Sequence, residues 1–139
     1  AAISLVAKKD DSVMRVVGQV TKHPSNPLFE QDKPWEPRLD NGYPNVVPPV
    51  KPGDAWQLWY GDCLAGCGKQ ALLYANSSDG ISWFQPDLGL YDIGRDMPAL
   101  KSIGTHNNVV LGSFSGGIGV YDDHAHEQNA SRRYKAMGE

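Results

Sequence analysis

One short segment near the C-terminus gathers the residue types that bind metal ions and transfer protons. Residues 122–127 read Asp-Asp-His-Ala-His-Glu. Alternate side chains of a strand point to the same face, so His124 and His126 would lie on one side, and two imidazoles with a carboxylate can hold a metal. The polar residues 128–131 that follow favour a solvated loop instead. We therefore expect no metal site and no cofactor.

The two cysteines of the chain, Cys63 and Cys67, are separated by three residues. Without a nearby histidine this spacing does not make a zinc site. A disulfide between them is one expectation, with a small stabilising effect because the closed loop is short. An oxidised pair would point to export, and the Asn-x-Ser sequences that begin at Asn76 and Asn129 agree with export without establishing it. The sequence leaves the compartment open.

Composition excludes several classes of protein. The chain has 139 residues and a formal net charge of −3, and its 15 Gly and 10 Pro disfavour a helical bundle. No apolar stretch approaches the roughly 18 residues that span a bilayer. The Lys and Arg residues are scattered, whereas nucleic-acid binding needs clustered positive charge. We expect a soluble protein with neither a nucleic-acid nor a membrane partner.

Short strands must position whatever site the chain carries. In Ala55–Tyr60 the apolar side chains alternate, with Trp56, Leu58 and Tyr60 on one face, which predicts a strand. Prolines recur between residues 21 and 52 and exclude helix there. Residues 1–20 fit strands or a short helix, and 61–69 fit a long hairpin loop. Further strands are expected at 43–47, 70–76, 81–84, 109–114, 118–121 and 133–137. The predicted class is all-β.

The segment 78–83, Ser-Asp-Gly-Ile-Ser-Trp, has the composition of a structural turn. Gly80 can adopt a positive φ, the Asp79 carboxylate can bond the turn backbone, and Trp83 can pack between sheets. We favour this structural interpretation over a ligand-binding one.

A weak internal repeat appears at an offset of 78 residues. It aligns Tyr43 with Tyr121, Asn45 with Asp123 and Trp56 with Tyr134. An inner strand followed by an aromatic-led strand is the pattern expected of successive β-propeller blades. Chance agreement is the alternative, because few of the aligned pairs are chemically alike.

Several short motifs occur in a fixed order along the chain: Asn26-Pro27-Leu28-Phe29, Pro34-Trp35-Glu36, Tyr43-Pro44-Asn45-Val46, Leu58-Trp59-Tyr60, Leu73-Tyr74-Ala75, Ser78-Asp79-Gly80-Ile81-Ser82-Trp83, Asn107-Asn108-Val109-Val110 and Arg132-Arg133-Tyr134-Lys135. Together they resemble the N-terminal part of the five-bladed β-propeller glycoside hydrolases related to invertase, levansucrase and arabinanase. The resemblance implies an incomplete antiparallel propeller of two to three blades. Residues 1–20 would form an N-terminal strand or arm, 21–114 a first blade region and 115–139 the start of the next blade.

The same resemblance implies catalytic carboxylates at the mouth of a central channel. One acid protonates the leaving oxygen, and another carboxylate attacks, activates water or stabilises the transition state. Asp123 matches the stabilising aspartate of the second blade, and a turn aspartate at a strand end is the alternative. Asn45 stands where the first-blade acid would be and cannot act as a base. Glu36 and Asp40 lie just upstream and are the candidate replacements.

The expected substrate-binding residues are Trp35, Tyr43 and Asn45, with Trp35 offering an apolar face for a sugar ring. The alternative for this region is a surface loop that Trp35 holds by packing into the core. A general-acid glutamate would come from a later blade. After Asp123 the remaining glutamates are Glu127 and Glu139, so the acid pair is incomplete in the sequence.

We therefore expect a carbohydrate-active protein that resembles a glycoside hydrolase, acting only when assembled. The alternative is a non-catalytic glycan-binding or self-assembling module that uses Trp35, Trp56 or Tyr43 as sugar platforms, and a third option is a truncated product. A five-bladed ring takes about 200 to 250 residues. Either a homo-oligomer, most simply a dimer, completes the ring, or the chain is a piece of something longer.

Overall fold

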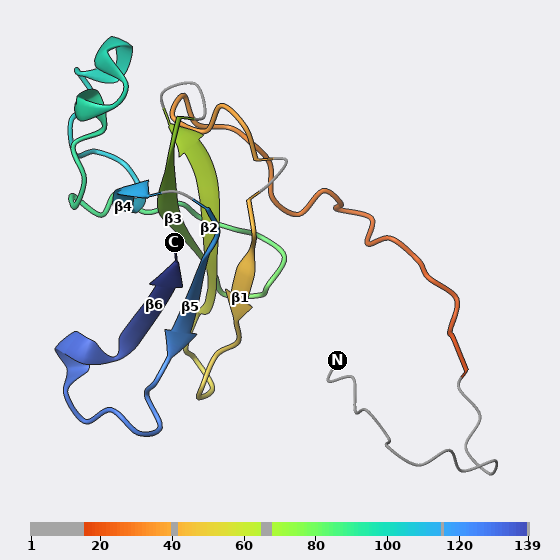
Figure 1. The fold of residues 1–139 in the computed structure, drawn as a ribbon. Helices are drawn as coiled ribbons and strands as arrows, with labels where there is room; N and C mark the ends of the chain where they lie inside the picture. The colour runs from red at the N-terminus through yellow and green to blue at the C-terminus, as the bar shows by residue number, and fades with distance from the viewer. Residues whose placement is uncertain (1–15, 40–41, 65–67, 115, 139) are drawn as a thin grey trace.

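The computed structural model describes residues 16–39, 42–64, 68–114 and 116–138, and the regular structure within these ranges is almost entirely antiparallel sheet (Figure 1). The predicted all-β class is therefore confirmed. No helix in these ranges is long and apolar enough to cross a membrane. The strands are β1 (Asn45–Val47), β2 (Trp56–Leu64), β3 (Lys69–Ser77), β4 (Val109–Phe114), β5 (Ile118–Asp122) and β6 (Tyr134–Gly138), and the short 3-10 helices are η2 (Ile93–Arg95), η3 (Pro98–Leu100) and η4 (Ala130–Arg132).

Strands β1 to β4 form one sheet in chain order, each antiparallel to the next. The hairpin of β2 and β3 is its centre, paired continuously from Trp56 opposite Ser77 to Leu64 opposite Lys69. Pairing thus extends through most of the segment 61–69 that the sequence predicted to be a loop. Leu64 is fully buried, and this burial favours continuing the strand past Gly61.

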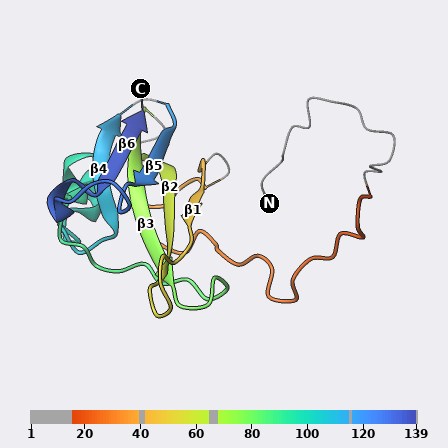
Figure 2. The same cartoon turned by 90° about the horizontal axis from the view of Figure 1, so that it is seen from below.

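The sheet has an apolar cluster on each face. Leu58, Tyr60 and Leu73 belong to one cluster, whereas Trp59 and Leu72 belong to the other. This separation follows from the alternation of side chains along β2 and β3. The second cluster also contains Val120 of β5, so the β5–β6 pair covers that face of the sheet (Figure 2).

In two predicted segments the described residues do not form the expected elements. Residues 16–20 are neither strand nor helix, and this red-orange stretch lies away from the sheets (Figure 1). Residues 1–15 lie outside the described part. In the predicted strand 81–84 a single bridge joins Phe84 to Asn76. The backbone N–H groups of Ile81 and Ser82 donate instead to the Asp79 carboxylate, which removes them from any strand ladder.

Strand register corrects the proposed repeat. Asn45 pairs with Trp59, and the residue 78 positions after Trp59 is Met137, which pairs with Gly119. If β6 corresponds to β2 at that offset, Asn45 therefore corresponds to Gly119 and not to Asp123. The connection between β5 and β6 is longer than the one between β1 and β2, and this difference breaks the constant offset.

Candidate functional site

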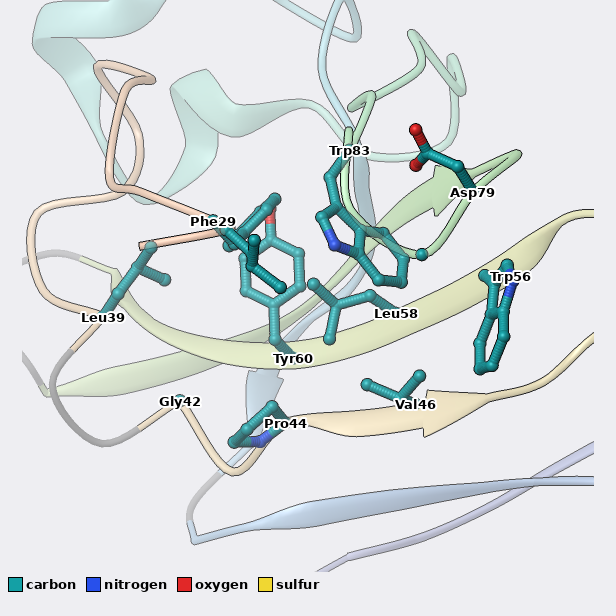
Figure 3. A pocket seen from close by; sticks show the side chains of 12 residues that line it. Phe29, Leu39, Gly42, Pro44, Val46, Trp56, Leu58, Tyr60, Asp79 and Trp83 are labelled. Atoms are coloured by element: carbon teal, nitrogen blue, oxygen red, sulfur yellow. The ribbon is translucent and has the colours of Figure 1, made fainter. Parts of the chain in front are cut away.

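A groove runs along β2 on the face that β5 and β6 leave uncovered. It encloses about 620 Å³, a volume in the range of small-molecule pockets. Leu58 and Tyr60 point up from β2 as its floor, and Trp56 stands at one end (Figure 3). One wall comes from β1 and the residues just before it. The other wall comes from residues 28–39 and from the turn after β3. The lining residues are Leu28, Phe29, Leu39, Gly42, Pro44, Val46, Trp56, Leu58, Tyr60, Asp79, Gly80 and Trp83.

The turn at residues 77–82 shapes the Trp56 end of the groove. Oδ1 of Asp79 accepts hydrogen bonds from the backbone N–H of Ser82 at 2.7 Å and of Ile81 at 2.8 Å, and from the Ser77 hydroxyl at 2.9 Å. These bonds, led by the one from Ser82, lower the pKa of Asp79, so its carboxylate is ionised at neutral pH. The role predicted for Asp79 is confirmed, whereas Trp83 packs on the sheet face opposite the β5–β6 pair and therefore does not lie between the two sheets.

Gly80 lets the Trp56 ring lie close against that turn. Its φ is +73°, as the sequence predicted, and a Cβ placed there would stand 3.3 Å from the Trp56 ring. A larger residue would therefore be strained and would press on the indole. The turn fixes the position of Trp56.

Behind the floor of the groove lies a buried carboxyl group. Glu36 is 1% exposed, and its Oε1 accepts from the Tyr60 hydroxyl at 2.5 Å and from Gln85 Nε2 at 2.6 Å. Burial raises the pKa of Glu36 above its ordinary value. Burial and the nearby Glu36 charge likewise raise the pKa of Tyr60.

Asn108 extends this network to Trp35. Its Nδ2 donates to the Tyr60 hydroxyl at 2.7 Å and to the Tyr74 carbonyl at 2.8 Å, while its Oδ1 accepts from Trp35 Nε1 at 2.9 Å. The Trp35 ring belongs to the core and is 9% exposed. It therefore has no open face for a sugar ring, and this region matches the packing alternative.

The structure brings Trp35 and Glu36 together but places them behind the groove. The oxygens of Glu36 face Tyr60, Gln85 and the backbone N–H groups of residues 32 and 33. A general acid or nucleophile must reach its substrate, and a side chain this buried does not meet that requirement. Asp40 lies outside the described residues.

Tyr43 and Asn45 lie at the junction of β1 and β5. Tyr43 is 53% exposed and has a φ of +43°, which is unusual for a residue with a side chain. Oδ1 of Asn45 accepts from the Val120 backbone N–H at 2.9 Å. Asn45 therefore joins β1, an edge strand of the four-stranded sheet, to β5, which is a structural role.

Asp123 follows β5 directly and occupies a strand-end turn. Its N–H donates to the Arg133 carbonyl at 2.9 Å, and its carboxylate lies 3.2 Å from His126 Nδ1 and 3.7 Å from Lys135 Nζ. The β5–β6 pair packs on the sheet face opposite Tyr60. Asp123 and Glu36 are thus on different sides of the sheet and do not converge on one substrate position.

The neighbouring Asp122 makes the strongest ion pair of this hairpin. Its side chain is 3% exposed, and its two oxygens accept from Arg133 at 2.7 Å and 2.6 Å. His124 lies 3.5 Å from the same carboxylate. In the part of the chain that the structure describes, no cluster of three or more His, Cys, Asp or Glu could hold a metal.

Cys63, near the end of β2, is bonded in a disulfide. The only other cysteine of the sequence is Cys67, which lies outside the described residues. The expectation of an oxidised pair agrees with this bond.

Sequence reasoning missed Trp83 as a residue of the site. It was assigned to packing between sheets, and it does pack on the core, but it also lines the groove beside Leu58 (Figure 3). The alternation of apolar residues predicted that Trp56, Leu58 and Tyr60 share one face of a strand, and this face forms the floor and one end of the groove. The wall could not be predicted, because Phe29 and Leu39 approach it from a segment without regular structure.

Comparison with known proteins finds no matching family model, no similar curated protein and no similar solved structure. The function of the chain must therefore be argued from the groove and the sheets themselves.

Proposed function

We propose that the chain is a carbohydrate-binding unit, built as the first blade and the beginning of the second blade of a glycosidase-type β-propeller. A four-stranded antiparallel meander followed by a new hairpin is the order of elements that such blades require. The observation that carries the binding function is the groove along β2, which has Trp56 and Trp83 in its lining.

Two half-buried indoles suit a sugar ligand. A sugar ring presents an apolar C–H face that packs on an aromatic ring, and its hydroxyls need polar partners at the edge. Trp56 and Trp83 supply the flat surfaces, and the ionised carboxylate of Asp79 at the rim can accept hydrogen bonds from hydroxyls. Because the turn holds Asp79 and Trp56 in place, the site is largely preorganised.

The geometry favours binding over hydrolysis. Glycosidases place two carboxyl groups about 5 to 10 Å apart on either side of the scissile bond. The residues that line the groove include one carboxylate, Asp79, and it is held by the turn. Glu36 is buried behind the floor, and Asp123 is on the other side of the sheet.

Titration calorimetry with a panel of neutral oligosaccharides tests this function. Trp56→Ala is expected to weaken binding at least tenfold, about 1.4 kcal/mol, because it removes the flat surface at the end of the groove. Tyr121→Ala is the matched control, since Tyr121 is an exposed aromatic residue on β5, and it should bind as the wild type does. Turnover of aryl glycosides that Asp123→Asn abolishes would instead support hydrolysis.

We also propose that the unit associates with itself through the β5–β6 pair. This second sheet has two strands where the first has four, and two strands alone are marginally stable. In the described part of the chain, β6 pairs with β5 alone, and Met137 on it is 84% exposed. An edge strand of this kind readily pairs with another copy.

A further inference from the structure

We propose that the groove takes a neutral glycoside that carries an apolar aglycone, such as an aryl glycoside, rather than a chain of several sugars. The sugar would lie at the end formed by Trp56 and Asp79, and the aglycone at the end formed by Phe29, Leu39 and Pro44. This assignment rests on the proposed carbohydrate-binding function and adds the chemical class of the ligand.

The two ends of the groove differ in chemistry (Figure 3). At one end the lining combines an indole, a glycine turn and an ionised carboxylate. At the other end Phe29, Leu39 and Pro44 present hydrocarbon surface. Phe29 is held there by an edge-to-face contact with Tyr60, with ring centroids 5.0 Å apart. A ligand that fills the whole groove must therefore be polar at one end and apolar at the other.

The floor of the apolar end offers no hydroxyl for a second sugar. The Tyr60 hydroxyl donates to Glu36 and accepts from Asn108 and Gln85. One proton and two lone pairs are all that a tyrosine hydroxyl has, so this group is fully used. A second sugar ring would lose hydration from its hydroxyls without gaining partners, whereas an aryl group has no such loss.

The charge at the rim restricts the sugar. Among the described residues that line the groove, Asp79 is the one with a charged side chain. It favours hydroxyl donors and repels a carboxylate on the ligand. Neutral sugars fit this end, and uronic acids do not.

The test compares matched ligands on the full chain. Dissociation constants are measured for methyl and phenyl glycosides of the same neutral sugars, for the corresponding trisaccharides and for phenol alone. The phenyl glycoside of the preferred sugar is expected to bind at least tenfold more tightly than its methyl glycoside, and the trisaccharide no more tightly than the methyl glycoside.

Variants at each end separate the two contributions. Leu39→Asp should abolish the gain from the phenyl group, so that phenyl and methyl glycosides bind equally to this variant, whereas Trp56→Ala should weaken the binding of both and keep the phenyl glycoside ahead. Leu28→Asp is the second variant, because Leu28 lines the groove outside the core cluster. Leu111→Asp, at an exposed leucine on β4, controls for the added charge.

The failures are distinguishable. Equal binding of methyl and phenyl glycosides, or tighter trisaccharide binding, overturns the aglycone assignment and leaves carbohydrate binding intact. If phenol alone binds as tightly as every phenyl glycoside does, the carbohydrate-binding function itself is overturned. If no ligand binds and Leu39→Asp lowers the mass of the protein in solution, the groove is a contact between copies and both proposals fail.

Discussion

Glu36 is the least exposed of the charged residues in the described part of the chain. It is nearly inaccessible to solvent but is surrounded by donors from Tyr60, Gln85 and two backbone N–H groups. These bonds lower its pKa, yet burial is the larger effect and the net pKa is raised. Folding therefore favours the protonated carboxyl group.

The pH dependence of stability should reveal this group. Because the folded-state pKa lies above the ordinary 4.5, the stabilisation is fully present below pH 4.5 and is lost as the pH rises through the folded-state pKa. The free energy of unfolding of the wild type should therefore fall relative to that of Glu36→Gln as the pH rises above about 4.5. Denaturant titrations of both proteins measure the difference, and a pH-independent difference would contradict the account.

The sequence identified Glu36 and Trp35 as notable residues and left two interpretations of them open, of which the structure matches packing of Trp35 into the core. A carboxylate beside a tryptophan in a proline-rich segment is equally compatible with an open channel and with a buried anchor. The deciding contacts come from Tyr60, Gln85 and Asn108, which are distant in sequence. Only the assembled sheet brings these groups together.

Among the elements, the β5–β6 hairpin contains an ion pair between the buried Asp122 and Arg133, whose side chain is 35% exposed. The Asp122–Arg133 bonds span its long connection, and the Arg133 bond is the main cause of the lowered pKa of Asp122. This contribution is present above the ordinary pKa of 3.8 and is lost as the pH falls through the folded-state value.

Two neighbouring substitutions test the importance of this pair. Asp122→Asn is expected to destabilise the protein by about 2 to 3 kcal/mol, because it removes a buried partner of Arg133. Asp123→Asn is the matched control and should cost less than about 1 kcal/mol, since its contacts are longer and more exposed. Thermal denaturation compares them, and equal losses would show that the ion pair is not the main anchor.

Strands with strong alternation were predictable, and their ends were not. Trp56 to Tyr60 indicated β2 because every second residue is aromatic or aliphatic. The continuation to Leu64 was missed because glycine disfavours strands locally and burial overrides that preference. The strand at 81–84 was overpredicted because the Asp79 carboxylate accepts the backbone N–H bonds of Ile81 and Ser82, which a strand ladder would otherwise use.

At the scale of the whole molecule, the proposed self-association follows from the two unequal sheets, because β5 and β6 form a sheet of two strands beside one of four. Light scattering should give the mass of a dimer, and Met137→Lys should shift it toward the monomer by placing a charge on the β6 edge. Leu90→Lys is the control, because Leu90 is also exposed but lies in a loop. A wild-type monomer at every concentration tested would contradict the proposed association.

The all-β class could be predicted from composition and alternation, whereas the arrangement of the sheets could not. The repeat that suggested two blades assumed a constant offset, and the longer connection before β6 breaks it. The groove has two walls, and one of them forms only when residues 28–39 fold over β2. No local pattern encodes that meeting.

Binding of a sugar in the β2 groove is the central claim, and the four tryptophans of the chain provide a direct test. In a two-dimensional proton–nitrogen spectrum each indole N–H gives one signal. On addition of a sugar ligand, the signals of Trp56 and Trp83 should shift, and those of buried Trp35 and Trp59 should stay in place. Unchanged signals from Trp56 and Trp83 at saturating ligand, or shifts confined to Trp35 and Trp59, would contradict the account.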